Sequence, residues 1–104
     1  MHALFVNFSV PEKTPDEVTE LFEPLVPSFG NLPGNLAKIW LADTDAGRYG
    51  ALYLWRSAED MDTYLASELW HAVQNHPAFT DFDVRDFAVI EPFTKATQPV
   101  LTIV

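Results

Sequence analysis

The chain has 104 residues, of which 48% are hydrophobic and 13% aromatic, so it has the composition of one packed domain. Its formal net charge of −9 argues against binding to nucleic acid or anionic membranes, which requires basic patches. The chain contains no cysteine, which excludes disulfides and thiolate metal sites. Because neither a secretory signal nor a membrane-spanning apolar run is visible, we expect a cytoplasmic protein with a single domain over residues 1–104.

The first predicted strand covers residues 2–9 and alternates between two faces. One face carries Leu4, Val6 and Phe8, and the other carries Ala3, Phe5, Asn7 and Ser9. A helix then starts at Thr14 as its N-cap, with Pro15 at the first helical position and Glu17 closing a capping box. We expect this helix to kink or end near Pro24, which has no N–H to donate.

Two further strands are predicted over residues 35–43 and 48–56, and the short turn between them indicates an antiparallel hairpin. Ser57 resembles the N-cap of a second helix. We expect that helix over residues 58–75, ending at His76–Pro77. Its apolar stripe consists of Met61, Tyr64, Leu65, Leu69, Ala72 and Val73.

A fourth strand is predicted over residues 82–91, where apolar residues alternate again. The C-terminal tail, about residues 94–104, includes a short apolar run, Val100 to Val104, which could pack across a dimer or extend freely. The resulting order, β-α-β-β-α-β, predicts an α+β ferredoxin-like fold, in which a four-stranded antiparallel sheet carries both helices on one face.

Both faces of the predicted sheet carry large apolar side chains, although two helices can cover only one of them. On the third strand Leu52 and Leu54 face one way. Tyr53 and Trp55 face the other. A sheet with one face in water would alternate apolar with polar residues. The second face therefore needs a partner, and a second copy of the chain is the simplest, which predicts a homodimer in the form of a dimeric α/β barrel.

Several short motifs resemble those of the YdhR-like monooxygenases of the dimeric α/β-barrel superfamily, which also contains antibiotic-biosynthesis monooxygenases. The residues that carry the resemblance are 34–40 (GNLAKIW), 51–55 (ALYLW), Glu91–Pro92 and Pro24. The resemblance covers most of residues 1–95 and implies a homodimer with a pocket between helices and sheet. It also implies oxidation of a small aromatic or polyketide-like substrate by O₂ without metal, flavin or other cofactor.

Oxygenation without a cofactor requires an electron-rich phenol or enol that loses a proton in an apolar cavity open to O₂. Asn7, a polar residue in an apolar strand, could donate to a developing oxyanion, a role that the related oxygenases support, or be a structural amide. Tyr53 and Tyr64 could hydrogen-bond the substrate or fill the core. His71 is a candidate general base.

The candidate substrate-binding residues are mostly aromatic. Lys38 lies between apolar residues and could hold an anionic substrate, or reach the rim and pair with an acid. Trp40 and Trp55 could form aromatic walls, although large aromatics in strands often only pack. Phe22 and Met61 complete the predicted lining.

We expect neither a metal site nor a haem. His71 and His76 are five residues apart, which places them well apart around a helix and makes them a poor metal pair. The haem degraders of the superfamily combine an Asn on the first strand with a Trp and a His on the second helix. Asn7 matches the first of these, but Tyr64 and Val73 stand at the other two positions.

Three functions stay open at this point. The first is a monooxygenase, and the second is a non-catalytic ligand-binding or stress-related dimeric barrel. The third is a lyase or isomerase that uses a base such as His71. A continuous cavity lined by Asn7 and the aromatic candidates would favour the oxygenase, whereas one filled by Phe22, Met61 and Leu65 would favour the binding protein.

Overall fold

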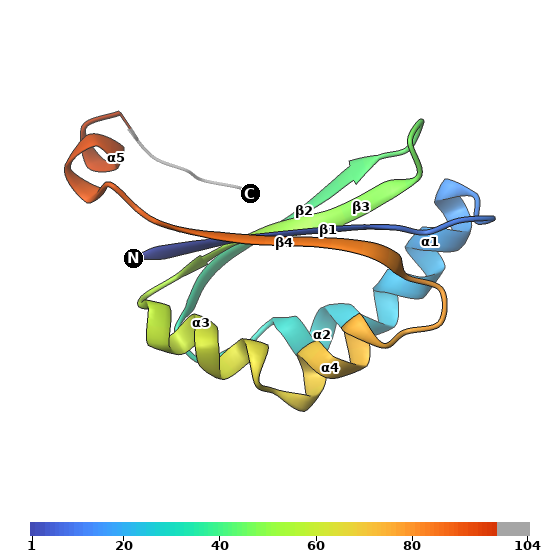
Figure 1. Cartoon of the computed structure of the whole chain (residues 1–104), viewed down its shortest axis with the longest axis horizontal. Helices are drawn as coiled ribbons and strands as arrows, with labels where there is room; N and C mark the ends of the chain where they lie inside the picture. The colour runs from blue at the N-terminus through green and yellow to red at the C-terminus, as the bar shows by residue number, and fades with distance from the viewer. Residues whose placement is uncertain (98–104) are drawn as a thin grey trace.

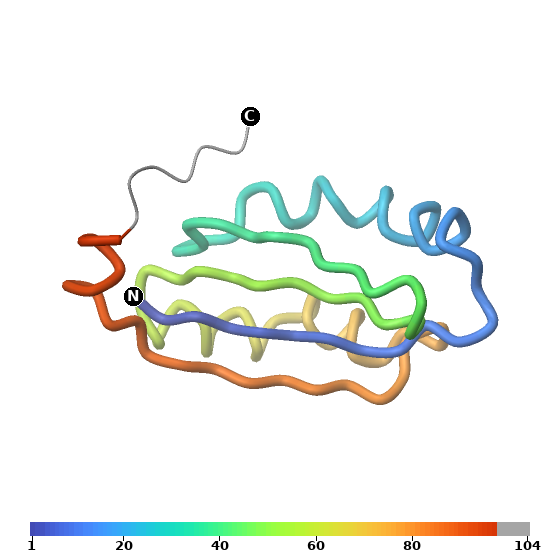
Figure 2. The backbone as a smooth tube through the Cα atoms, turned by 90° about the horizontal axis from the view of Figure 1, so that it is seen from above, coloured from blue at the N-terminus to red at the C-terminus, as the bar shows by residue number. Residues whose placement is uncertain are grey.

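The computed structural model describes residues 1–97, in which a four-stranded antiparallel sheet is covered on one face by helices α1 to α4 (Figure 1). The elements in chain order are β1 (His2–Ser9), α1 (Pro15–Phe22), the 3-10 turn η1 (Glu23–Leu25), α2 (Val26–Phe29), β2 (Asn35–Asp43), β3 (Arg48–Trp55), α3 (Ala58–Leu65), α4 (Glu68–Gln74), β4 (Thr80–Ala88) and α5 (Glu91–Thr97). The strand order is β2-β3-β1-β4, so β2 and β4 lie at the edges (Figure 2). This is the α+β ferredoxin-like fold that the sequence predicts.

Alternation along the two central strands determines which side chains meet the helices. Leu4 on β1 pairs with Tyr53 on β3. Val6 pairs in the same way with Ala51, and all four side chains are buried. Trp55, at the end of β3, is fully buried on the same side. The helices therefore cover the face of Leu4 and Val6, a choice between the two faces that the sequence leaves open.

The chain between β1 and β2 crosses the sheet as three short helical pieces, here called the α1–η1–α2 segment. Thr14 caps it as predicted: its Oγ1 accepts from the Glu17 N–H at 3.2 Å, and its own N–H donates to Glu17 Oε1 at 2.9 Å. α1 ends just before Pro24, which is also as predicted. Val18 and Phe29 are the buried residues of the three pieces, and Leu21, Phe22 and Leu25 pack against the core while only half-buried.

The second helix differs from the prediction, because residues 58–75 form two helices instead of one. Ser57 caps α3 as predicted, with its hydroxyl accepting from the Asp60 N–H at 3.1 Å. A second cap follows at Ser67, whose hydroxyl accepts from the Trp70 N–H at 3.2 Å and starts α4.

The end of the chain also differs from the prediction. β4 spans Thr80–Ala88 instead of residues 82–91, and α5 takes the place of the strand end and the start of the tail. Pro92 explains the change, because proline cannot donate to a sheet ladder but fits the first turn of a helix. The apolar run Val100 to Val104 lies outside the described residues. Within residues 1–97, no helix has the length and apolar character needed to cross a membrane.

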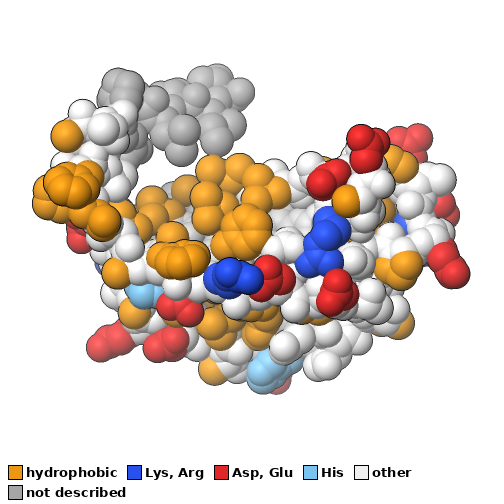
Figure 3. All heavy atoms as spheres, turned by 45° about the horizontal axis from the view of Figure 1, so that its top comes forward, with side chains coloured by type: hydrophobic (Ala, Val, Ile, Leu, Met, Phe, Trp, Pro, Cys, Tyr) orange, Lys and Arg blue, Asp and Glu red, His pale blue; other side chains and the backbone are white. Residues whose placement is uncertain are grey.

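The face of the sheet opposite the helices carries exposed apolar side chains. Leu52 is 37% exposed and Phe87 is 60% exposed, and the strand register places both on the face of Phe5. Figure 3 shows hydrophobic side chains gathered over this face, next to α5. Phe93 on α5 is 70% exposed. We call this the open face; it agrees with the predicted presence of apolar residues on both sides of the sheet.

β2 contains a bulge at Leu36. Asn35 pairs with Trp55, but Ala37 pairs with Leu54, the residue directly before Trp55. β2 therefore contains one extra residue at this point that has no partner on β3. The Asn35 side-chain amide donates to the carbonyls of Ala37 at 3.0 Å and Leu54 at 3.2 Å. These bonds hold the irregular end of β2 against β3, and the pairing is regular from Ala37 onward.

Candidate functional site

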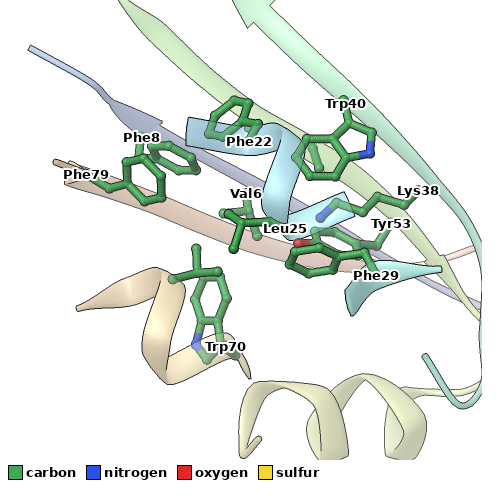
Figure 4. Close-up of a pocket in the computed structure, with 13 residues that line it drawn as sticks. Val6, Phe8, Phe22, Leu25, Phe29, Lys38, Trp40, Tyr53, Trp70 and Phe79 are labelled. Atoms are coloured by element: carbon green, nitrogen blue, oxygen red, sulfur yellow. The ribbon is translucent and has the colours of Figure 1, made fainter. Parts of the chain in front are cut away.

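A pocket lies between the helices and the side of the sheet that they cover (Figure 4). Its lining is aromatic and aliphatic apart from one amine, and consists of Val6, Phe8, Phe22, Leu25, Phe29, Lys38, Trp40, Gly50, Ala51, Tyr53, Trp70, Val73 and Phe79. The cavity volume is about 30 Å³, far below the roughly 300–1,000 Å³ of pockets that hold drug-sized ligands. An aromatic ligand therefore fits only when lining side chains move aside. Two lining residues of the α1–η1–α2 segment, Phe22 and Leu25, are only half-buried, so this segment is able to do so.

The Lys38 amine points into this pocket among three aromatic rings (Figure 4). Its Nζ lies 3.0 Å from the ring centroid of Phe29, 3.9 Å from that of Trp40 and 4.8 Å from that of Tyr53. The register of β2 explains this position, because Lys38 pairs with Tyr53, whose side chain faces the helices. Within residues 1–97 the amine has neither an ion pair nor a hydrogen bond. The groups that attract it electrostatically are therefore the faces of the aromatic rings.

Burial lowers the pKa of Lys38 from 10.5 to about 7, because the ammonium loses its hydration among apolar side chains. The aromatic ring faces attract the cation and offset part of this loss. At neutral pH a large fraction of the Lys38 side chains therefore carries a free electron pair. Such an amine can take a proton from a weak acid and, once protonated, can hold the resulting anion.

Tyr53 lines the pocket and is hydrogen-bonded to Tyr64 behind it, with 2.9 Å between the two hydroxyl oxygens. Burial raises the pKa of Tyr64 to about 12 and raises the pKa of Tyr53 well above its usual range. Both phenols therefore stay neutral at physiological pH and act as hydrogen-bonding groups. Trp55 stacks on both rings, at centroid distances of 5.8 Å from Tyr53 and 5.2 Å from Tyr64. This stack fixes the orientation of Tyr53 in the pocket wall.

The structure brings some of the predicted site residues together and separates others. Those that line the pocket are Phe22, Lys38, Trp40 and Tyr53. Those that lie in the buried core without lining it are Tyr64, Trp55 and Met61. His71 is exposed on α4 and does not line the pocket, so the only basic side chain among the lining residues is Lys38.

Asn7 lies on the open face of the sheet, away from the pocket. Its Oδ1 accepts two hydrogen bonds from the Arg48 guanidinium, one of them from Nε at 2.8 Å. The same guanidinium donates to Ser9 Oγ at 2.9 Å and to Asp81 Oδ2 at 3.0 Å. The expectation that Asn7 contributes to the pocket does not hold, because strand alternation turns its side chain to the other face.

Several lining residues have no clear signal in the sequence. Phe29 follows two prolines, in a stretch whose composition indicates the start of a turn. Trp70 lies outside the apolar stripe of the single helix predicted over residues 58–75. The break at Ser67 rotates the helical face, so that Trp70 is buried while Ala72, a stripe residue, is exposed. A second N-cap signal at Ser67 could have revealed this change of face.

Comparison with known proteins identifies the family. Residues 3–100 match the sequence family described as "Putative mono-oxygenase ydhR". The chain belongs to this family. The match confirms the resemblance carried by the motifs at residues 34–40 and 51–55. No curated protein matches the chain in sequence.

Solved structures with the same fold include oxygenases and a haem degrader. A "putative antibiotic biosynthesis monooxygenase" from Deinococcus radiodurans is 16% identical, with a TM-score of 0.69 over 100% of this chain and 99% of the other. A mutant of SnoaB, a cofactor-independent oxygenase from Streptomyces nogalater, is 22% identical, with a TM-score of 0.65 over 86% and 93%. The haem degrader MhuD from Mycobacterium tuberculosis is 21% identical, with a TM-score of 0.68 over 86% and 96%. At these identities the comparison establishes the shared fold.

The residues of the pocket do not suit a haem of the kind that MhuD binds. No histidine lines the cavity, and His71 is exposed. His76 accepts the Ala78 N–H on its Nδ1 at 3.0 Å, and its ring stacks on the Phe79 ring at 4.3 Å. Neither histidine is placed as an axial ligand to an iron in the pocket. Residues 1–97 also contain no group of three or more histidine and acidic side chains that could hold a metal ion.

Proposed function

We propose that the protein is a monooxygenase that oxidises a small aromatic or polyketide-like substrate with O₂ in the Lys38 pocket, without metal or flavin. The observation that carries this proposal is a primary amine inside an aromatic pocket, 3.0 and 3.9 Å from the ring centroids of Phe29 and Trp40, where burial lowers its pKa. Membership of the YdhR family supports the reaction type. The shared fold of SnoaB, a cofactor-independent oxygenase, supports the absence of a cofactor by analogy.

Lys38 has the properties of the base that such a reaction needs. A suitable substrate has an acidic CH₂ or enol next to aromatic rings, as in an anthrone. The neutral amine takes the proton, and the ammonium that forms stays beside the substrate anion and stabilises it. The anion transfers its electrons to O₂ and forms a C–O bond, and loss of water leaves a ketone. The balance is CH₂ plus O₂ giving C=O plus H₂O, so no external reductant is needed.

The aromatic lining suits a planar substrate. Trp40 is 38% exposed at the pocket wall and packs against Phe22 and Phe29, with ring centroids 5.6 and 5.7 Å away. Both phenylalanines lie on the α1–η1–α2 segment. We propose that this segment moves outward to admit the substrate and closes over it, which excludes water from the anion.

We also propose a homodimer in which the open faces of two sheets meet. The exposed Leu52, Phe87 and Phe93 provide the apolar surface for this contact. Sedimentation equilibrium tests it, with Leu52→Lys as the variant. A dimeric wild type and a monomeric variant would support the arrangement, and a monomeric wild type would contradict it.

The test of the reaction is O₂ uptake by chelator-treated protein with anthrones, dihydroquinones and tetracyclic phenols. Lys38→Met keeps the length of the side chain and removes the amine, and Lys13→Met removes an exposed lysine as the matched control. We expect saturable uptake by wild type and Lys13→Met, and a decrease of roughly 10²-fold or more in Lys38→Met, as for loss of a general base. Equal uptake by Lys38→Met would rule out Lys38 as the base.

A non-catalytic ligand-binding barrel is the second candidate, because a pocket that admits an aromatic compound beside Lys38 can also bind it without oxidising it. Calorimetry with the same compounds distinguishes the two. Saturable binding without O₂ uptake would indicate the binding protein. The lyase or isomerase hypothesis has less support, because its candidate base, His71, is exposed on α4 outside the pocket.

A further inference from the structure

We propose that Lys38 also forms a covalent imine with aromatic aldehydes and ketones that enter its pocket. This is an amine–carbonyl activity beyond the proposed oxygenation, and it uses the same site without requiring O₂. It follows from the placement of a primary amine, without an ion pair in residues 1–97, inside an aromatic cavity.

The surroundings of the amine favour nucleophilic attack. An exposed lysine is protonated at neutral pH and has no electron pair to share. Lys38 is withdrawn from water, and no carboxylate within residues 1–97 pairs with it to hold a proton there. Lysines that form Schiff bases in enzymes are activated in this way, by desolvation in an apolar pocket.

The rings around Nζ select the class of carbonyl compound. Phe29 and Trp40 present their faces to the amine at 3.0 and 3.9 Å from the ring centroids. Once the α1–η1–α2 segment has moved outward, a flat aryl group attached to the carbonyl can pack between such rings with offset or edge-to-face contacts. A small aliphatic aldehyde has no equivalent contact area. We therefore expect aryl carbonyl compounds to react in preference to aliphatic ones.

The chemistry balances with groups that the pocket contains. The Nζ electron pair attacks the carbonyl carbon, a C–N bond forms, and the C=O π electrons move to oxygen. One proton moves from nitrogen to that oxygen and gives a carbinolamine. The C–O bond then breaks, and the hydroxyl leaves as water with the second nitrogen-bound proton, which gives the imine with no change of oxidation state. Tyr53 can assist this proton transfer. When Tyr64 donates the hydrogen bond between the two hydroxyls, the Tyr53 hydrogen is free for a substrate oxygen.

Reductive trapping of the wild-type protein tests the proposal. The protein is incubated without O₂ at neutral pH with benzaldehyde or acetaldehyde and cyanoborohydride, and the modified amines are located by peptide mass spectrometry. The chain has three lysines, and Lys13 and Lys95 are exposed on the surface. The neutral fraction of an amine with a pKa near 7 is roughly 10³-fold larger than that of an ordinary lysine. We expect Lys38 to be modified far ahead of the other two lysines.

The N-terminal amine serves as an internal reference. It lies outside the pocket, where it pairs with Glu91 at 3.1 Å, so the aromatic lining does not affect which of the two aldehydes it reacts with. We expect the ratio of Lys38 to N-terminal modification to be at least tenfold higher with benzaldehyde than with acetaldehyde, and to fall when naphthalene competes for the pocket. Modification of Lys38 no faster than that of Lys13 and Lys95 would overturn the proposal. An unchanged ratio for the two aldehydes would also overturn it.

This result is separate from the test of oxygenation. Trapping takes place without O₂, so it is independent of whether the protein oxidises any substrate. Trapping at Lys38 without O₂ uptake would support the imine alone. O₂ uptake without trapping would support the oxygenase and overturn the imine.

Discussion

Replacing Lys38 by methionine should stabilise the protein at pH values below the pKa of an ordinary lysine. The unfolded chain binds a proton on this amine with a pKa near 10.5, whereas burial lowers the folded-state pKa to about 7. Between these values the unfolded state binds more protons, so the unfolding free energy of the wild type rises with pH across this window. Below the folded-state value both states are protonated, and the penalty for burying the charge is complete.

The size of the effect follows from the two pKa values. The difference between 10.5 and about 7 corresponds to an upper bound of about 5 kcal/mol, at about 1.4 kcal/mol per pH unit. Part of the amine still contacts water and the ring faces offset part of the penalty, so we expect about 2 kcal/mol. Methionine has nearly the volume of the lysine stem and no charge, so its own packing cost is small.

Urea unfolding at several pH values and one protein concentration measures this difference. The unfolding free energy of Lys38→Met should exceed that of the wild type by about 2 kcal/mol near pH 6. This difference should vanish as the pH approaches the pKa of the amine in the unfolded chain. Lys13→Met removes an exposed lysine, and its unfolding free energy should depend on pH in the same way as that of the wild type. If the wild type and Lys38→Met ran parallel over the whole range, the amine would not be buried as the structure has it.

Three other substitutions test separate parts of the site. Tyr53→Phe removes the hydrogen bond to Tyr64 and should cost about 1 kcal/mol in urea unfolding. Phe22→Ala removes a half-buried ring above the cavity, and calorimetry should show tighter binding of tetracyclic phenols, at a stability cost of about 2 kcal/mol. Unchanged binding would mean that this ring does not restrict entry. Asn7→Ala removes the acceptor of the Arg48 guanidinium on the open face, so urea unfolding should show a loss of about 1–2 kcal/mol, with O₂ uptake per folded protein unchanged. A selective loss of uptake would restore Asn7 to the site.

Local signals predict the fold well where they act within a few residues. The capping box of Thr14 and Glu17 and the interruption at Pro24 depend only on neighbouring residues, and the structure has both. The break at Ser67 escapes prediction because apolar residues continue at helical spacing on both sides of it. Only the direction in which they point changes between α3 and α4. α5 escapes prediction because Val89 and Ile90 extend the alternation of β4 beyond its end, although Pro92 stops the strand.

The site is less predictable because it depends on which face of the sheet the helices cover. Alternation places Lys38 and Trp40 on the same face of β2, and it places Asn7 on the face of β1 opposite Leu4 and Val6. It does not say which face of β1 lies on the same side of the sheet as Lys38. That relation comes from the pairing of β2 and β1 with β3. Once Tyr53 faces the helices, Lys38 must face them too, and Asn7 must face away.

The bulge at Leu36 decides which side of the sheet receives the amine. If pairing ran on evenly from Asn35 and Trp55, Lys38 would lie opposite Leu52, whose side chain faces away from the helices. Ala37 and Ile39 would then fill the places of Lys38 and Trp40, and both are apolar enough to pack there. Such a chain could fold normally and yet have no base in its pocket. The side-chain amide of Asn35 donates to one carbonyl on β2 and one on β3 at the bulge, and thus helps to keep the Lys38 amine on the pocket side of the sheet.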